Sequence, residues 1–168
     1  LYMVLSIYGN SEENTDLASK YVGRETCIEC HLNEYNSWVG SHHDKAMEHA
    51  NDSTVLGDFN NKSITYNGKT HKMYKRDGAF VVYTDGPDGK MAEFEIKFTF
   101  GFYPLQQYLV PFEGGRLQTL PLTWNSKDSV WYHMAEVIYT DEIIEHDNWL
   151  HWSNQSQNWN SMCADCHS

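Results

Sequence analysis

All four cysteines of the chain fall in two copies of one five-residue pattern. The first copy runs from Cys27 through Cys30 to His31, and the second from Cys163 through Cys166 to His167. C-x-x-C-H is the attachment signature of c-type haem, in which the two thiols form thioethers with the porphyrin vinyl groups. The histidine that follows supplies the proximal nitrogen to the iron. The sequence therefore predicts two covalently bound haems c, with His31 and His167 as the proximal iron ligands.

Other chemistries also use paired cysteines. A four-cysteine zinc site, a redox dithiol and structural disulfides are the alternatives. None of them needs a histidine after the second cysteine in both copies. With nine histidines in 168 residues, chance places one at a given position about 5% of the time and at both positions about 0.3%. The repeated histidine therefore favours haem.

The excess of acidic over basic residues limits the classes of molecule that the chain is expected to bind. The chain has 12 Lys and Arg residues against 23 Asp and Glu residues, a formal net charge of −11. This balance argues against nucleic acid, which recruits basic patches, and against anionic membrane surfaces. It favours a redox partner protein with a basic docking face. Hydrophobic residues make up only 40% of the chain, although aromatic residues reach 14%, so we expect the apolar porphyrins to serve as part of the core.

Haem attachment of this type takes place outside the cytoplasm, so we expect a periplasmic or otherwise exported protein. Residues 1–9 are mostly apolar but too short for a membrane-spanning helix, which needs roughly 20 residues. They fit a remnant of a signal peptide or membrane anchor as well as an ordinary N-terminal strand. We expect an N-terminal segment over 1–20 and a dihaem domain over 21–168. Because the chain stops one residue after its second motif, we also expect a longer natural protein with a downstream domain.

Helices are predicted around the first motif. Thr26 and Glu29 have the spacing of a capping box, which predicts a helix from the motif to about Trp38. Ser41 and Asp44 repeat that spacing and predict a second helix from His42 to about His49.

The middle of the chain has the period of strands. Asn67-Gly68 is a favoured two-residue hairpin turn. Strands are expected on either side of it and at 79–84, 91–100, 105–110 and 116–122. These form a β-rich insert over about 63–124, an antiparallel meander of four to six strands. A short helix or loop over 150–162 leads into the second motif. The predicted class is therefore α+β, with helical haem-binding segments at both ends of the chain and the meander between them.

Each iron needs a second axial ligand or leaves that position open. The leading candidates are His43 and His151, and the alternatives are His42, Met47 and His133. On the expected second helix, His43 and Met47 lie one turn apart. A methionine ligand would raise the reduction potential relative to two histidines. We expect His71 to be an exposed residue of the hairpin.

Several short segments together resemble a known family. Tyr21-Val22-Gly23, the first motif, Glu34-Tyr35, Trp38, Ser41-His42-His43 and Ala46-Met47 resemble the opening of the multihaem cytochromes c typified by the tetrahaem electron carrier of ammonia-oxidising bacteria. Phe100-Gly101, 103–109, 150–152 and 157–160 are similar to the branch in which this region precedes tetratricopeptide repeats. The resemblance implies periplasmic electron transfer and an axial role for His43. This chain departs from it by having two haem motifs instead of four and no repeat domain.

The leading function is a dihaem module for electron transfer. One alternative is a multihaem redox enzyme that acts on a small nitrogen or oxygen species at an open iron. The other is a haem-based gas or redox sensor that belongs to a longer protein. The abundance of histidines outside the two motifs argues against an open iron and so favours the electron carrier.

Overall fold

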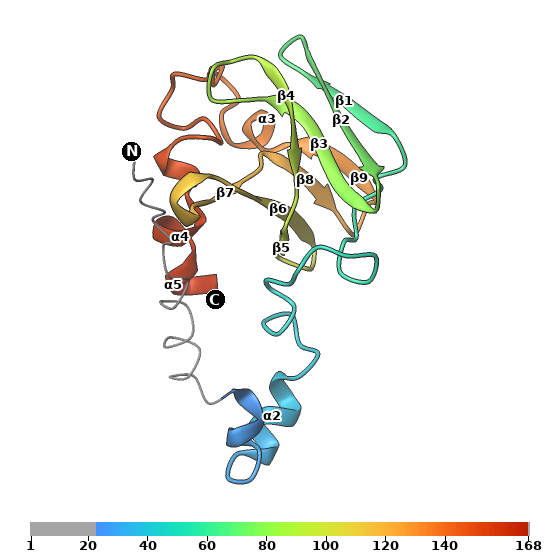
Figure 1. Cartoon of the computed structure of the whole chain (residues 1–168), viewed down its shortest axis with the longest axis vertical. Coiled ribbons are helices and arrows are strands. Elements are labelled where there is room, and N and C mark those ends of the chain that lie inside the picture. Colours follow the sequence, from blue (N-terminus) through green and yellow to red (C-terminus); the bar gives the residue numbers. More distant parts are fainter. Residues whose placement is uncertain (1–22, 168) are drawn as a thin grey trace, which may run out of the picture. The chain divides into compact units, whose positions relative to one another are not determined.

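The computed structural model describes residues 23–167, and for Cys166 and His167 it describes the backbone alone. The chain divides into two compact units, one ending at Val39 and the other beginning at Gly40. Figure 1 shows the elements of each unit.

In the first unit, a short 3-10 helix η1 (Arg24–Cys27) precedes the helix α2 (Leu32–Trp38). The predicted end of the helix at Trp38 is confirmed, but the predicted start in a capping box at Thr26 is wrong. The His31 N–H donates to the Cys27 carbonyl at 2.9 Å and closes a turn over the motif. His31 then has non-helical backbone angles as the N-cap of α2. The haem motif therefore precedes the α-helix instead of lying within it.

The second predicted helix, over 42–49, is also wrong. Gly40 N–H donates to the Asp44 carboxylate at 2.7 Å, and Asp44 N–H donates to the Ser41 hydroxyl at 3.2 Å. These capping bonds form, but the residues after them make turns instead of a helix. The chain then extends along strand β5 (Phe98–Phe100), where Thr99 N–H donates to the Glu48 carbonyl at 2.9 Å. Pairing with a strand thus takes the backbone groups that a helix would use.

Four strands form the first sheet, in the order in which they occur along the chain. They are β1 (Lys62–Tyr66), β2 (Lys69–Arg76), β3 (Ala79–Asp85) and β4 (Met91–Glu95), all antiparallel. The predicted hairpin between β1 and β2 is confirmed. Asn67 and Gly68 both have positive φ, 46° and 72°, as the favoured two-residue turn requires.

The second sheet contains five strands. They are β5, β6 (Leu105–Pro111), β7 (Leu117–Thr119), β8 (Leu122–Asn125) and β9 (Val130–His133), in the order β5-β6-β8-β9 with β7 paired to β6. The predicted strand over 91–100 is broken, because Ile96 N–H bonds to Phe80 of the first sheet while Lys97 N–H bonds to Leu109 of the second. The predicted strand over 116–122 is interrupted at Pro121, which has no N–H to donate.

The helical elements are short. They are η2 (Glu113–Gly115), α3 (Met134–Ile138), η3 (Gln155–Gln157), α4 (Trp159–Met162) and α5 (Ala164–His167). The predicted α+β class with helical haem segments at both ends is therefore wrong. The described chain is mostly antiparallel β in two sheets. The first motif precedes the two-turn helix α2, and the second runs from the end of α4 through the single turn of α5.

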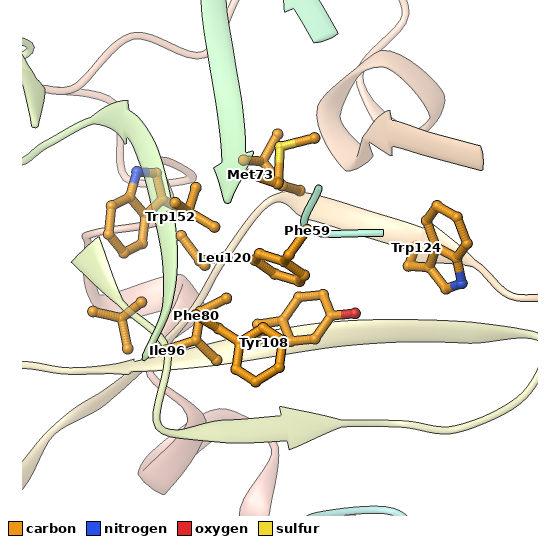
Figure 2. Close-up of a cluster of buried hydrophobic side chains, with 11 residues drawn as sticks. Phe59, Met73, Phe80, Ile96, Tyr108, Leu120, Trp124 and Trp152 are labelled. Carbon is orange, nitrogen blue, oxygen red and sulfur yellow. The ribbon is translucent and has the colours of Figure 1, made fainter. Parts of the chain in front are cut away.

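The core of the second unit lies between the two sheets. Met73 and Phe80 come from the first sheet, and Tyr108 and Trp124 from the second, and all belong to one buried cluster (Figure 2). Phe59 packs edge-on against Phe80 and Tyr108, with ring centroids 5.1 and 5.5 Å apart. Aromatic rings therefore supply much of the volume that the modest aliphatic content leaves to be filled.

Candidate functional site

The first haem motif lies on the surface of its unit. Cys27 and Cys30 are exposed free thiols, and His31 is exposed as well. None of the described residues of this unit is buried. Leu32, Trp38 and Val39 expose 41–53% of their surface. Two accessible thiols, a following imidazole and exposed apolar side chains fit a covalently attached porphyrin, which would need access to the thiols and would cover apolar surface.

The second motif is anchored to the edge of the second sheet. Asn160 of α4 accepts the Leu117 N–H at 2.7 Å, and Gln118 forms an isolated bridge with Asn158, so α4 is held beside β7 (Figure 1). Cys163 directly follows α4 and is half-buried. Burial raises the pKa of its thiol, and the nearby Thr119 of β7 opposes part of this shift. The backbone of Cys166 and His167 lies in α5, one helical turn further on.

The predicted distal ligands near the first motif lie in the turns that open the second unit. His42 and His43 are exposed, and Met47 is half-buried. The His42 ring lies 5.5 Å from Phe102 and 5.8 Å from Tyr103, centroid to centroid. Because the expected helix does not form, His43 and Met47 are not related by a helical turn. The assignment of either residue to an iron stays a prediction.

The other two predicted ligands, His133 and His151, lie together in the interior of the second unit. His151 is 4% exposed and His133 is 8% exposed. Both nitrogens of His151 have partners, since Nδ1 lies 2.8 Å from the Ser153 hydroxyl and Nε2 lies 3.4 Å from the Asp85 carboxylate. An axial role for His151 therefore requires breaking a buried network, and this assignment stays a prediction.

Asp85 is the centre of that network. It accepts a hydrogen bond from Lys69 at 2.8 Å, and its backbone carbonyl accepts the Trp152 indole N–H at 2.7 Å. Burial alone would raise the pKa of Asp85, but hydrogen bonds from His151 and Lys69 outweigh it and hold that pKa well below its usual range. The carboxylate is thus ionised and acts only as an acceptor.

His71 is the residue that sequence reasoning missed. It was expected on the exposed side of the hairpin, but it is 1% exposed and faces the interior. Its ring centroid lies 5.4 Å from that of His133, which stacks on Tyr66 at 4.0 Å. Burial lowers the pKa of His71. Burial is also the main cause, and the charge of His71 the second, of the lowering of the pKa of His133 to about 3. The alternation in β2 was the available signal, because it places His71 on the same face as the buried Met73.

Two thiols followed by an imidazole, with apolar surface beside them, are the groups that a covalently bound haem c requires. The comparison with protein families agrees, since residues 26–85 match the family described as cytochrome c554 and c-prime. The matched range begins just before Cys27 and includes Cys30 and His31. It supports a c-type cytochrome electron carrier with covalently bound haem c. No curated protein matches this chain, and no solved structure matches it.

Proteins of the cytochrome c family are typically exported. In the part of the chain that the structure describes, no helix is both long and apolar enough to cross a membrane. The predicted N-terminal segment, with its possible signal or anchor, lies outside the described residues.

Proposed function

We propose that this chain is a dihaem electron-transfer module of the periplasm. When bound, haem c supplies a one-electron exchange at its iron. The observation that carries the proposal is the exposed pair Cys27 and Cys30 followed by His31, within a segment that matches a cytochrome family. The chain's own residues would attach the porphyrin, supply the proximal imidazole and cover its apolar faces.

The second haem rests on Cys163, Cys166 and His167. Its support is the repeated pattern in the sequence and the position of Cys163 at the end of α4, where pairing with β7 holds the backbone. The half-buried Cys163 beside Thr119 offers a thiol close to the second sheet.

Of the distal candidates, His43 is the one we propose for an iron. It is exposed and it follows Ser41 in a compact turn. His151 and His133 are enclosed in the buried network instead. We also propose that this chain is related to the branch of multihaem cytochromes c in which such a region precedes tetratricopeptide repeats.

The acidic surface supports a redox partner with a basic docking face. Over 136–147 the chain carries five exposed carboxylates and no lysine or arginine, and these are Glu136, Asp141, Glu142, Glu145 and Asp147. Exposed apolar side chains lie in the same segment and just beyond it, among them Val137, Ile143 and Trp149. Charge around exposed apolar groups favours rapid, short-lived docking of an oppositely charged partner.

Haem stoichiometry tests the proposal. The chain, matured in a host that attaches c-type haem, is expected to carry two haems by intact mass and by its pyridine haemochrome spectrum. Replacing Cys27 and Cys30 by alanine, or Cys163 and Cys166 by alanine, is expected to leave one haem in each case. One haem in the unaltered chain would contradict the dihaem proposal, and no covalent haem would contradict the whole function.

Carbon monoxide separates the carrier from the enzyme and the sensor. An electron carrier with both irons six-coordinate is expected to keep its reduced spectrum when carbon monoxide is added. A shifted spectrum would instead indicate an open iron and would favour the other two functions.

A further inference from the structure

A cavity of about 70 Å³ lies inside the second unit, beside the buried histidines. Its lining includes His71 and His133 together with apolar side chains such as Ile144 and Leu150. One water needs only about 10–15 Å³ of such space. The cavity is therefore large enough for a guest of several non-hydrogen atoms.

Two ring nitrogens at this cavity lack partners. His71 Nε2 and His133 Nδ1 are fully buried, and neither has a hydrogen-bond partner among the described residues. A buried polar atom that is left unpaired has lost its hydrogen bonds to water without replacing them, which is unfavourable. Both residues line the cavity, so a guest that reaches these nitrogens would supply the missing partner.

The neighbouring contacts determine which role His71 plays. The Asp85 carboxylate only accepts, so the Thr84 hydroxyl donates to it, at 3.3 Å. Thr84 Oγ1 then accepts from His71 Nδ1 at 2.8 Å. Because the proton of His71 is on Nδ1, its Nε2 presents a bare lone pair, and the matching guest must donate an N–H or O–H.

The surroundings argue against a metal ion as that guest. Within the described residues, no group of three or more His, Cys, Asp or Glu side chains is arranged to hold one. Asp85, the nearest carboxylate, is already paired with Lys69 at 2.8 Å and with His151. Asp85 and Lys69 thus already have partners, Lys69 also pairing with Glu145 at 3.0 Å, and burying a further unpaired charge is costly, which favours a neutral guest.

We propose that this cavity binds a small neutral molecule of about five non-hydrogen atoms that donates a hydrogen bond from N–H or O–H to His71 Nε2. The flat Tyr66–His133 stack and the apolar wall suit a planar ring. The site does not depend on either haem motif, although Thr119 lies both on the cavity wall and beside Cys163.

The test uses two rings of the same size on the haem-loaded chain. Pyrazole has an N–H donor, and isoxazole does not. Titration calorimetry is expected to show saturable binding of pyrazole, and at least about tenfold weaker binding of isoxazole, since one buried hydrogen bond separates them. The haem absorption spectrum, recorded over the same titration, is expected to stay unchanged.

Variants locate the site. His71→Leu is expected to weaken pyrazole binding at least about tenfold, while Lys72→Gln, the exposed neighbour on β2, leaves it unchanged. Circular dichroism checks the fold of each variant. If His71→Leu does not fold, the comparison of pyrazole with isoxazole on the unaltered chain decides the question.

Three results would overturn the proposal. They are no saturable binding of pyrazole, equal binding of the two rings, and binding that tracks a change in the haem spectrum. The first would show that the cavity holds only solvent, the second that no hydrogen bond selects the guest, and the third that the probe binds iron.

Discussion

His43 and His71 show how differently two histidines of one chain are placed. His43 lies exposed in a turn, and His71 lies 1% exposed in the interior. The exposed His43 imidazole is accessible to an iron, whereas the His71 ring is enclosed, with Nδ1 paired to Thr84 and Nε2 buried without a partner. The two histidines therefore differ in how easily another group can reach them.

His43→Ala is expected to convert one of the two haems from low-spin to high-spin, because the proposed distal ligand is removed. The measurement is the absorption spectrum of the oxidised protein. His49→Ala, an exposed histidine of the same segment, serves as the control and is expected to keep both haems low-spin. An unchanged spectrum in His43→Ala would transfer the assignment to His42 or Met47.

His133 makes the stability of the second unit depend on pH. Its folded pKa is about 3, against an ordinary value of 6.5. Between these values the unfolded chain binds a proton that the folded chain excludes. The free energy of unfolding is therefore expected to fall as pH drops from about 6 to 4, by up to ~1.4 kcal/mol per unit.

The groups that face His133 set the limits of this effect. The pKa of His71 is also lowered by burial, so His71 destabilises the folded chain over the same pH range. The pKa of Asp85 is depressed as well, so the stability that its ionised carboxylate contributes is lost only at more acidic pH. His151, Lys69 and the Tyr66 ring complete the surroundings. In urea unfolding over this pH range, His133→Gln is expected to flatten the slope, and His49→Gln is expected to keep it. Equal slopes in all three proteins would contradict the assignment.

At the scale of elements, the loop before β1 is fastened to β6 by a buried polar network. The Tyr108 hydroxyl accepts the Gly57 N–H at 3.0 Å and donates to the Gln106 amide oxygen at 2.9 Å. That oxygen also accepts the Leu56 N–H at 2.8 Å. The loop contains no element of its own, so these bonds hold its backbone against the sheet.

Tyr108→Phe is expected to destabilise the protein by roughly 1–3 kcal/mol, because the Gly57 N–H is left without its acceptor. Thermal or urea unfolding measures the loss. Tyr83→Phe on β3, a half-buried tyrosine, is the control and is expected to stay near the unaltered value. Equal stability of Tyr108→Phe and the unaltered chain would show that the loop finds another partner.

The elements also show where pattern reasoning succeeds. The hairpin at Asn67-Gly68 was predictable because the turn is determined by the two residues in it. The helix over 42–49 was not, because the pairing with β5 that replaces it joins residues about fifty positions apart. Capping patterns describe only the local alternatives, and strand pairing outweighs them.

For the whole molecule, the net charge of −11 acts on an approaching partner at longer range than any contact does. The rate of electron exchange with a small basic redox protein is expected to fall several-fold as salt rises from about 10 to 200 mM, because screening shortens the reach of the charges. Stopped-flow spectroscopy measures the second-order rate constant.

Charge reversal locates the docking surface. Glu136→Lys combined with Glu142→Lys is expected to lower the rate at low salt more than Glu113→Lys combined with Glu25→Lys, which makes the same change of charge elsewhere. A rate that does not depend on salt would contradict a charged docking surface. An equal loss in both pairs would contradict its placement over 136–147.

The sequence by itself predicted the haem chemistry, since each motif is local and its residues need only lie next to each other along the chain. It also determined the hairpin and the acidic balance. Only the tertiary structure decided that the chain is mostly antiparallel β, that His71 joins His133 and His151 in the interior, and that a cavity lies beside them. Those features depend on contacts between strands far apart in the sequence, such as β2 and β9, whose side chains meet only when the two sheets pack together.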